Sequence, residues 1–350
     1  MENYDRIIKQ DMEELWTRDL PYNKFRNSTV LITGASGMLA SYMTYFLMFL
    51  NEKGYNIRVI TLVRNAEKAW KKFKDFQNNN QFQLMVQDVC DEIKLEGDVD
   101  YIIHAAGNAS PYYIVNDPTG IVYANTIGTM RVAELAKEKR TKMILYTSTR
   151  EVYGKMPGNV EQITEDLFGS LDPLEPRSCY PESKRMAETI LNSYYCQYKV
   201  PFIAVRIAHS YGPGMMLNND GRVMADFISD VVQGRDIVLK SAGTAKRAFC
   251  YITDAVAGIL FALLKGQEGN AYNVANENEE VEIRTVAEML TKCIPEKNLS
   301  VVFDIPETMS AGYSKMGRVK LDTDKLENLG WNCRVSLKQG LQRTLESFRE

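Results

Sequence analysis

Short apolar segments alternate with longer helical segments over most of this 350-residue chain. Strands that alternate with helices predict an α/β fold, in which helices cover both faces of a parallel sheet. The expected strands are residues 30–33, 57–63, 82–86, 101–106, 143–147 and 202–207, and the expected helices include 39–50, 121–139, 182–198 and 223–233.

The same pattern divides the chain into parts of unequal size. Apolar side chains recur at helical spacing over residues 3–20, so we expect residues 1–27 to form a leader helix packed on the main domain. Glycines, prolines and polar residues crowd positions 210–222, where the alternation loosens. We expect the main domain at 28–207 and 247–275, and a smaller C-terminal substrate-binding lobe at 208–246 and 276–350.

A glycine turn joins the first expected strand to the first long helix. Its sequence is Thr33-Gly34-Ala35-Ser36-Gly37-Met38-Leu39-Ala40. Glycines let the backbone approach a pyrophosphate, and the helix N-terminus offers free N–H groups and the positive end of its dipole. An ordinary tight turn is the alternative, but the position directly after the first strand favours a Rossmann-type, doubly wound dinucleotide domain. The residues expected to contact the dinucleotide here are Gly34, Ser36, Gly37, Met38 and Leu39.

The end of the second strand bears on the choice of cofactor. NAD-binding domains usually have an acid at this place for the ribose 2′-hydroxyl, but this chain has Arg64. A guanidinium suits a 2′-phosphate, which favours NADP over NAD. A solvent-facing arginine above bound NAD is the alternative. Asp88 and Val89, after the third strand, are expected beside the adenine, although Asp88 also suits a simple turn.

A tyrosine and a lysine stand four residues apart at Tyr180 and Lys184. On a helix this spacing places both side chains on one face, so the Lys184 cation is expected to lower the pKa of the Tyr180 phenol. Such a tyrosine takes a proton from a sugar hydroxyl while hydride leaves the carbon. The segment 146–154, with Thr149, precedes the pair at the end of the fifth strand, where ligands bind such sheets.

These motifs together resemble the extended short-chain dehydrogenase/reductases, specifically the NAD-dependent epimerase/dehydratase group that acts on nucleotide sugars. The resemblance covers about residues 28–345 and includes His104-Ala105-Ala106, Asn125-Thr126-x-Gly128-Thr129, Thr149-x-x-Val152-Tyr153-Gly154, Arg206, Tyr211-Gly212-Pro213 and Arg247-x-Phe249-x-Tyr251-x-x-Asp254. It implies that Thr149, Tyr180 and Lys184 are catalytic. It also implies that Ala105, Ala106 and Asn125 lie on the cofactor side.

Several stretches look most similar to UDP-glucuronate decarboxylases. They are Ala109-Ser110-Pro111, Pro176-Arg177-Ser178-Cys179-Tyr180, Asp220-Gly221-Arg222-Val223, Lys246-Arg247-Ala248-Phe249 and Leu329-Gly330-Trp331. That resemblance implies that Glu151 faces the sugar and that Arg247 lies near the substrate. Arg222 is a candidate clamp for the diphosphate, since a guanidinium fork matches two phosphate oxygens. A surface ion pair is the alternative for either arginine.

The sequence departs from the family at two site positions. Arg150 stands where 4,6-dehydratases carry an aspartate that protonates the leaving hydroxyl, and an arginine cannot donate that proton at neutral pH. Arg150 is instead expected to add positive charge near the sugar or to pair with Glu151, unless it points into solvent. His209 replaces the usual asparagine near the diphosphate. A satisfied interior histidine is its alternative, and His104, inside a strand, is expected to be structural.

The composition limits the class of protein. The net charge is −3, which does not favour a nucleic-acid partner, and the longest apolar run, 42–50, is too short to span a bilayer. The first residues show no signal-peptide pattern, so we expect a cytoplasmic protein. Six cysteines occur singly and only two histidines are present, so neither a disulfide framework nor a metal site is indicated.

The expected activity is NAD(P)-dependent remodelling of a nucleotide-diphosphate sugar through a 4-keto intermediate, as in decarboxylases and epimerases of the family. Arg64 and His209 favour a second enzyme, an NADPH-dependent 4-keto-sugar reductase. A non-catalytic dinucleotide sensor is a third alternative, against which Thr149, Tyr180 and Lys184 argue. Family members commonly form homodimers through helices that correspond to 120–138 and 182–198. The apolar residues expected on that surface are Ile121, Val122, Ile127, Met186 and Ile190.

Overall fold

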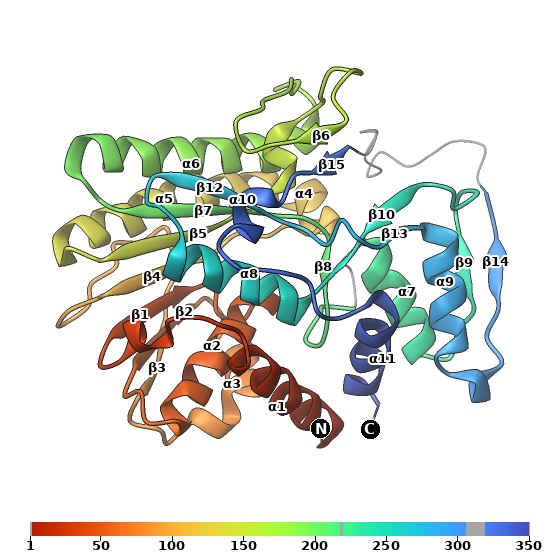
Figure 1. Ribbon diagram of the computed structural model, residues 1–350, viewed down its shortest axis with the longest axis horizontal. Helices are drawn as coiled ribbons and strands as arrows, with labels where there is room; N and C mark the ends of the chain where they lie inside the picture. Colours follow the sequence, from red (N-terminus) through yellow and green to blue (C-terminus); the bar gives the residue numbers. More distant parts are fainter. Residues whose placement is uncertain (1, 218–219, 306–318, 350) are drawn as a thin grey trace.

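The computed structural model describes residues 2–217, 220–305 and 319–349. Seven parallel strands form one central sheet in the order β12-β7-β5-β4-β1-β2-β3 (Figure 1). The strands are β1 (Thr29–Thr33), β2 (Arg58–Val63), β3 (Phe82–Val86), β4 (Tyr101–His104), β5 (Met143–Thr149), β7 (Phe202–Ile207) and β12 (Asn270–Val274). This order confirms the expected Rossmann-type fold, and it reverses direction between β1 and β4, where such sheets bind their ligands.

Helices cover both faces of the sheet, which explains why its strands are almost continuously apolar. On one face, α2 (Met38–Glu52), α3 (Ala66–Phe73) and α8 (Ile252–Lys265) share a core with Val30, Ile32 and Ile103. On the other face, α5 (Pro118–Lys139) and α6 (Cys179–Tyr198) pack on Leu31 and Ile102. Successive residues of one strand therefore enter opposite cores, as the period of two in a β-strand requires.

A smaller group of elements lies beside the sheet (Figure 1). It contains α7 (Val223–Val232), α9 (Ile283–Lys292) and two short ribbons, in which β9 (Ile237–Leu239) pairs with β14 (Val301–Phe303) and β10 (Lys246–Ala248) with β13 (Glu280–Glu282). A further pair, β8 (Ser210–Tyr211) with β11 (Cys250–Tyr251), joins the start of this lobe to its return into α8. Residues 306–318 of the expected lobe lie outside the described residues.

The two ends of the chain meet on the main domain. Helix α1 (Glu2–Trp16) contacts α2, α8 and α11 (Leu337–Ser347), and Figure 1 shows both termini on the same side of the molecule. The buried carboxylate of Asp11 accepts hydrogen bonds from Tyr42 (2.9 Å) and Tyr251 (2.8 Å) and pairs with Arg343 (3.0 Å). Buried Arg18 pairs with buried Asp254. Polar contacts of Asp11 and Arg18 therefore join the N-terminal segment to residues from early and late in the chain. The apolar face of α1 packs in addition to these contacts.

The remaining short elements also return to the main domain. Strand β15 (Lys320–Leu321) pairs with β6 (Gln162–Ile163), and α10 (Asp324–Glu327) contacts α8 and β12. Helix α4 (Pro111–Asn116) precedes α5 and contacts it.

Candidate active site

The glycine turn lies where β1 meets α2, and its geometry requires glycine. Gly34 has φ +65°, and a Cβ there would come within 2.7 Å of the Ala105 carbonyl oxygen and of the Ala106 nitrogen. Gly37 caps the N-terminus of α2 with an extended backbone, so Met38 begins the helix. The expected cofactor residues of the turn, Ser36 and Leu39 included, are therefore next to the end of β4, at the reversal of strand order.

Arg64 and Asp88, which we considered separately in the sequence, lie close together. The Arg64 guanidinium is 3.8 Å from the Asp88 carboxylate, and both side chains are exposed. They follow neighbouring strands, β2 and β3, and Val89 beside them is buried in the core under α5. This places the positive charge of Arg64 at the same edge of the sheet as Gly34.

The tyrosine and the lysine occupy the first two turns of α6, as their spacing predicts, and both are buried. The Lys184 ammonium donates to the Thr147 carbonyl (2.8 Å), and burial lowers its pKa to about 7. Burial raises the pKa of Tyr180 above its ordinary value, the Glu151 carboxylate raises it further, and a hydrogen bond with Thr149 lowers it. The expected lowering of the Tyr180 pKa by Lys184 is wrong for this structure, because burial of the phenol outweighs the nearby cations.

Buried Asn125 provides a test of whether the residues at this end of the sheet fit a bound dinucleotide. Asn125 donates from Nδ2 to Ser183 Oγ (2.9 Å), while its Oδ1 is buried without a hydrogen-bond partner. Gly107 lies beside that oxygen with φ +146°, and a Cβ there would be 2.5 Å from Asn125 Oδ1 and 3.4 Å from Lys184 Nζ. A buried acceptor without a partner is costly unless a ligand satisfies it. Together with the cradle at Gly34, the residues present fit a bound dinucleotide.

Thr149 and Glu151 follow each other at the carboxyl end of β5. Thr149 Oγ1 accepts the Glu151 N–H (3.2 Å) and so begins the 3₁₀ turn Arg150–Tyr153. The Glu151 carboxylate pairs with Arg177 at 2.8 Å, and both side chains are 22% exposed. The predicted pairing of Arg150 with Glu151 is therefore wrong.

Arg150 turns towards the lobe instead. It reaches His209 (Nη1 to Nε2, 3.4 Å) and the Val319 carbonyl (3.3 Å). His209 is exposed and has φ +43°, so the alternative of an interior histidine is wrong. Its ring lies 5.9 Å from that of Phe249. The two positions that depart from the family pattern thus contact each other.

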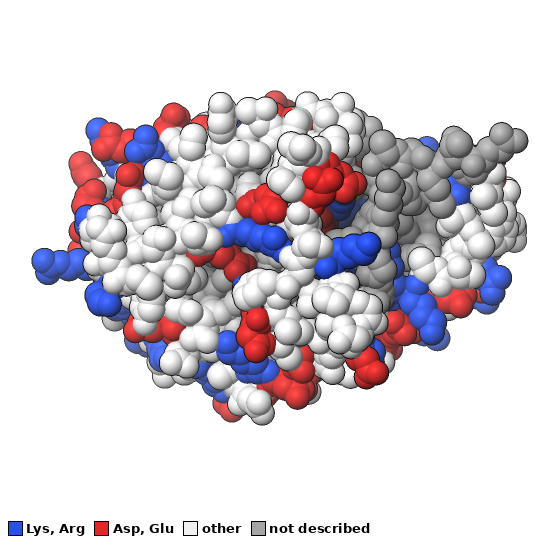
Figure 2. All heavy atoms as spheres, turned by 90° about the horizontal axis from the view of Figure 1, so that it is seen from above, with Lys and Arg blue, Asp and Glu red and all other residues white. Residues whose placement is uncertain are grey.

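The remaining two expected substrate residues differ in their surroundings. Arg222 forms a fork on Asp220, with Nε at 2.5 Å and Nη2 at 2.7 Å from the two carboxylate oxygens, and its charge lowers the pKa of Tyr180. Arg247 lies in β10 and donates to the Lys246 carbonyl (2.7 Å). On the face shown in Figure 2, basic and acidic side chains lie next to one another.

His104 has a structural place, as its position in a strand predicts. Its ring bridges Thr33 Oγ1 (2.7 Å) and Thr129 Oγ1 (3.0 Å), and burial lowers its pKa to about 3. The ring therefore ties β1 to α5 as a neutral group.

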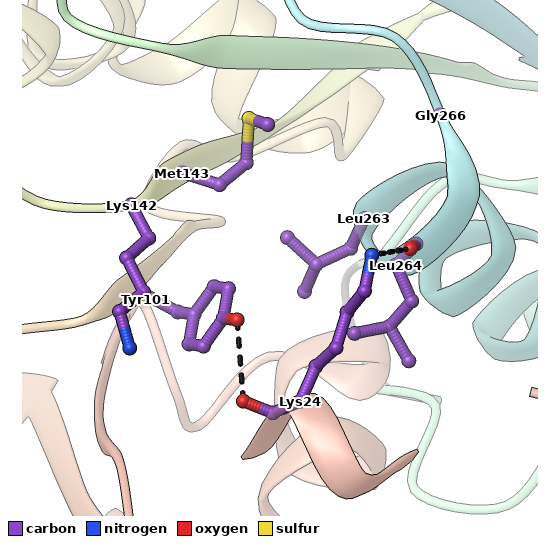
Figure 3. Close-up of a pocket in the computed structure, with 7 residues that line it drawn as sticks. All are labelled: Lys24, Tyr101, Lys142, Met143, Leu263, Leu264 and Gly266. Atoms are coloured by element: carbon purple, nitrogen blue, oxygen red, sulfur yellow. Dashed lines mark hydrogen bonds between the residues drawn. The ribbon is translucent and has the colours of Figure 1, made fainter. Parts of the chain in front are cut away.

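A separate cavity of about 420 Å³ lies at the opposite, amino-terminal end of the sheet (Figure 3). Its wall includes Tyr101 at the start of β4 and Met143 at the start of β5. Lys24 donates to the Leu264 carbonyl (2.6 Å) and Lys142 pairs with Asp100 (2.9 Å), so both cations at the cavity have protein partners.

Within residues 2–217, 220–305 and 319–349, no cluster of three or more His, Cys, Asp or Glu side chains is placed to hold a metal ion. In the same part of the chain, every helix is too short or too polar to cross a membrane.

Sequence reasoning assigned no role to three residues of the site: Gly107, Arg177 and Asp220. Gly107 was detectable as a glycine directly after the His104-Ala105-Ala106 strand end. Arg177 stands only three residues before Tyr180, but its carboxylate partner is 26 positions away in the chain. Asp220 stands only two residues before Arg222, but nothing in the sequence marked it as the partner of that guanidinium.

The fold and the tyrosine–lysine site define an enzyme of the Rossmann class that uses a nicotinamide dinucleotide. The family model described as "NAD dependent epimerase/dehydratase family" matches residues 30–275, so the chain belongs to that family. UDP-glucuronic acid decarboxylase 6 of Arabidopsis thaliana is 33% identical over 92% of this chain and 89% of its own length. UDP-glucuronic acid decarboxylase 1 of Xenopus tropicalis is 32% identical over 97% of this chain and 78% of its own.

Solved structures share the fold at lower identity. An epimerase from Methanothermobacter thermautotrophicus has a TM-score of 0.79 at 20% identity, covering 93% of this chain and 94% of that one. UDP-glucuronic acid 4-epimerase from Bacillus cereus, in complex with UDP-glucuronic acid and NAD, has a TM-score of 0.74 at 22% identity, covering 91% and 98%.

Proposed function

We propose that this enzyme oxidises C4 of a nucleotide-diphosphate sugar and then changes the sugar through the resulting 4-keto intermediate, with decarboxylation of a UDP-glucuronate-like sugar as the preferred reaction. The observation that carries the proposal is the meeting of Thr149, Tyr180 and Lys184 at the carboxyl end of β5, beside the unsatisfied Asn125 oxygen. The names of the relatives at 32–33% identity support a uronate as substrate.

The roles of the catalytic residues follow from their positions. Tyr180 Oη accepts the proton of the C4 hydroxyl, and the Thr149 hydroxyl holds that oxygen by hydrogen bonding. When bound, the dinucleotide supplies the acceptor for the hydride that leaves C4. Lys184, fixed by the Thr147 carbonyl, lies beside Gly107 on the cofactor side, where its ammonium orients the nicotinamide ribose.

A 4-keto group makes the C6 carboxylate a β-keto acid, which explains the preference for decarboxylation. The bond between C5 and C6 breaks, carbon dioxide leaves, and the electron pair passes to the C4 oxygen as an enolate. The hydroxyls of Tyr180 and Thr149 are the donors placed to stabilise that oxygen. C5 then takes up a proton, and C4 regains its hydride while its oxygen regains the proton from Tyr180, so that the net change is loss of carbon dioxide. Arg150, beside His209 at the lobe side of the turn, adds the positive charge that favours an anionic sugar.

The cofactor and the diphosphate are bound by other parts of the site. We assign the pyrophosphate to the Gly34–Leu39 turn and the adenosine side to Asp88 and Val89, with Arg64 favouring NADP over NAD. Arg222, pre-oriented by Asp220, is assigned to the diphosphate of the sugar nucleotide, and Arg247 to the substrate side of the lobe.

A 4-keto-sugar reductase is the second candidate, because Arg64 suits NADPH. A reductase releases oxidised cofactor after each turnover, whereas a decarboxylase or an epimerase recovers its cofactor on the enzyme. Purified protein that retains cofactor, released by denaturation and identified by mass, favours the first proposal.

The deciding experiment is incubation with UDP-glucuronate, UDP-glucose and UDP-galactose, each with NAD or NADP, followed by mass analysis of the nucleotide sugars. We expect the uronate to lose the mass of carbon dioxide and the Tyr180→Phe protein to leave it unchanged. Interconversion of UDP-glucose and UDP-galactose without loss of mass, detected by chromatography, would identify an epimerase instead. Binding without any turnover would support the dinucleotide sensor.

A further inference from the structure

The ion pair between Arg177 and Glu151 connects the two segments that carry the catalytic side chains. Glu151 stands two residues after Thr149, in the turn that follows β5. Arg177 stands three residues before Tyr180, in the 3₁₀ turn Pro176–Ser178 that leads into α6. The guanidinium and the carboxylate are 2.8 Å apart. The ion pair thus joins the segment of Thr149, proposed to hold the C4 oxygen, to the segment of Tyr180, proposed to take its proton.

Both partners are held by their own backbone surroundings. The Glu151 N–H donates to Thr149 Oγ1. Next to Arg177, the Ser178 N–H donates to the Glu175 carbonyl (2.8 Å), and the Ser178 hydroxyl donates to the Asp172 carbonyl (2.5 Å). With both side chains 22% exposed, the pair is partly shielded from water, where a charge interaction is stronger than at the open surface.

The charges of the pair act on Tyr180 in opposite directions. The Glu151 carboxylate raises the pKa of the Tyr180 hydroxyl, and the Arg177 guanidinium lowers it. A carboxylate without its counter-charge opposes the formation of a phenolate beside it. Burial of Tyr180 already opposes formation of its phenolate, and the Glu151 charge opposes it further. Cancelling the charge of Glu151 therefore favours proton acceptance by Tyr180.

We propose that Arg177 is a positioning residue: its ion pair with Glu151 balances the charge of that carboxylate in the turn beside Tyr180, so that Tyr180 can accept the C4 proton. The inference rests on the proposed role of Tyr180 as the proton acceptor. It does not depend on which nucleotide sugar is the substrate.

Arg185 offers a matched control on the same helix. It also ties α6 to the segment after β5, but through backbone carbonyls, with Nε on Val152 (2.6 Å) and Nη2 on Gly169 (2.8 Å). Arg185→Gln therefore removes an arginine that joins the same segments without leaving Glu151 unpaired. It is expected to lower thermal stability, while the pH at which activity reaches half its maximum stays unchanged.

The test is the pH profile of kcat/KM for the wild type, Arg177→Gln, Arg177→Lys and the double variant Arg177→Gln/Glu151→Gln. The profile is taken on whichever nucleotide sugar the wild type converts, so failure of UDP-glucuronate alone leaves the test intact. For Arg177→Gln we expect the rising limb to move to higher pH by about one unit, with about tenfold lower activity at neutral pH. In Arg177→Lys, the rising limb should lie close to its wild-type pH. In the double variant, the rising limb should also return towards the wild-type pH, while the maximum rate stays low.

Ionisation of Tyr180 gives a second readout that needs no turnover. With NADP bound, the phenolate absorbance of each protein is compared with that of its Tyr180→Phe counterpart over pH, which isolates this one tyrosine. A rise in the Tyr180 pKa in Arg177→Gln, with none in Arg185→Gln, supports the proposal even if every tested sugar fails. An unchanged Tyr180 titration in Arg177→Gln, or an equal shift in Arg185→Gln, overturns it.

Discussion

Arg64 and Asp88 stand 3.8 Å apart at the ends of the neighbouring strands β2 and β3, and both side chains are exposed. An exposed ion pair of this kind contributes only about 0–1 kcal/mol. A phosphate, which accepts several charge-assisted hydrogen bonds from a guanidinium, is expected to displace Asp88 readily. Asp88 therefore orients the Arg64 guanidinium, but the ion pair is weak enough for a phosphate to replace it.

Replacing Arg64 with aspartate is expected to shift cofactor preference towards NAD. Loss of one charge-assisted contact, about 1.5–3 kcal/mol, predicts roughly ten- to hundredfold weaker NADP binding. Titration calorimetry of the wild type and the variant with both dinucleotides measures the change. A wild type that already prefers NAD by a wide margin would contradict the assignment of Arg64.

Removal of the Tyr180 hydroxyl should abolish most catalysis without loss of cofactor binding. Since general acid–base catalysis contributes about 10²–10⁴-fold, Tyr180→Phe is expected to lose at least about 10²-fold in kcat. Lys184→Met should lower both kcat and dinucleotide affinity, because Lys184 lies between Thr147 and the cofactor side at Gly107. Near-native turnover of Tyr180→Phe would remove Tyr180 as the base.

The enzyme is expected not to make a 4-keto-6-deoxy sugar from dTDP-glucose. Arg150, which the resemblance places at the position of the dehydratase acid, carries no proton that it can donate at neutral pH, and its guanidinium contacts His209. Glu151→Gln should lower kcat more than it raises KM for the true substrate. Steady formation of the 4-keto-6-deoxy product by the wild type would restore the dehydratase assignment.

A homodimer is expected through α5 and α6, and the structure corrects one of the five apolar residues that the sequence indicated for that surface. Ile121 is buried against Ile114 and Tyr180, so its place on that surface is corrected. Tyr123, Met130 and Met186 are 53%, 42% and 50% exposed on the two helices. Sedimentation should give about twice the 39.9 kDa mass of the chain, and Met130→Glu/Met186→Glu should give the monomer. A wild-type monomer at micromolar concentration would contradict the dimer.

Stability should fall as pH rises through the titration of Asp11. Burial raises the pKa of Asp11 to about 6 from 3.8, although Tyr42, Tyr251 and Arg343 favour its charged form. The native state therefore holds a proton that the unfolded chain has lost between these values, so the stabilisation present below pH 4 is lost by about pH 7.

Linkage over this window predicts a loss of about 2 kcal/mol in the free energy of unfolding between pH 4 and pH 7, relative to Asp11→Asn. Urea unfolding of both proteins at the two pH values measures this difference, which cancels the contributions of other groups. Equal pH dependence in the two proteins would show that Asp11 titrates as it does in the unfolded chain.

The local elements of this fold were predictable because each leaves a periodic or conformational signal in the sequence. The strand Phe202–Ile207 and the start of α7 at Val223 lie where the pattern indicated. Gly34 is readable as a turn glycine, and the four-residue spacing of Tyr180 and Lys184 is sufficient to place them on one face of a helix. Strand β12, which was not expected, is short and half polar (Asn270-Ala271-Tyr272-Asn273-Val274), so it carries little periodic signal.

Side chains that pair only after folding brings them together leave no periodic or conformational signal in the sequence. Asp11 looked like a polar position on an amphipathic helix, yet it is buried, because it meets Tyr42, Tyr251 and Arg343 from 31, 240 and 332 residues away. Likewise, nothing local to Glu151 distinguished adjacent Arg150 from Arg177 as its partner. Strand and helix formation depend on the nearest few residues, which the sequence by itself determined. The charge state of Tyr180, Lys184 and Asp11 depends on burial and on distant charges, and only the tertiary structure decided it.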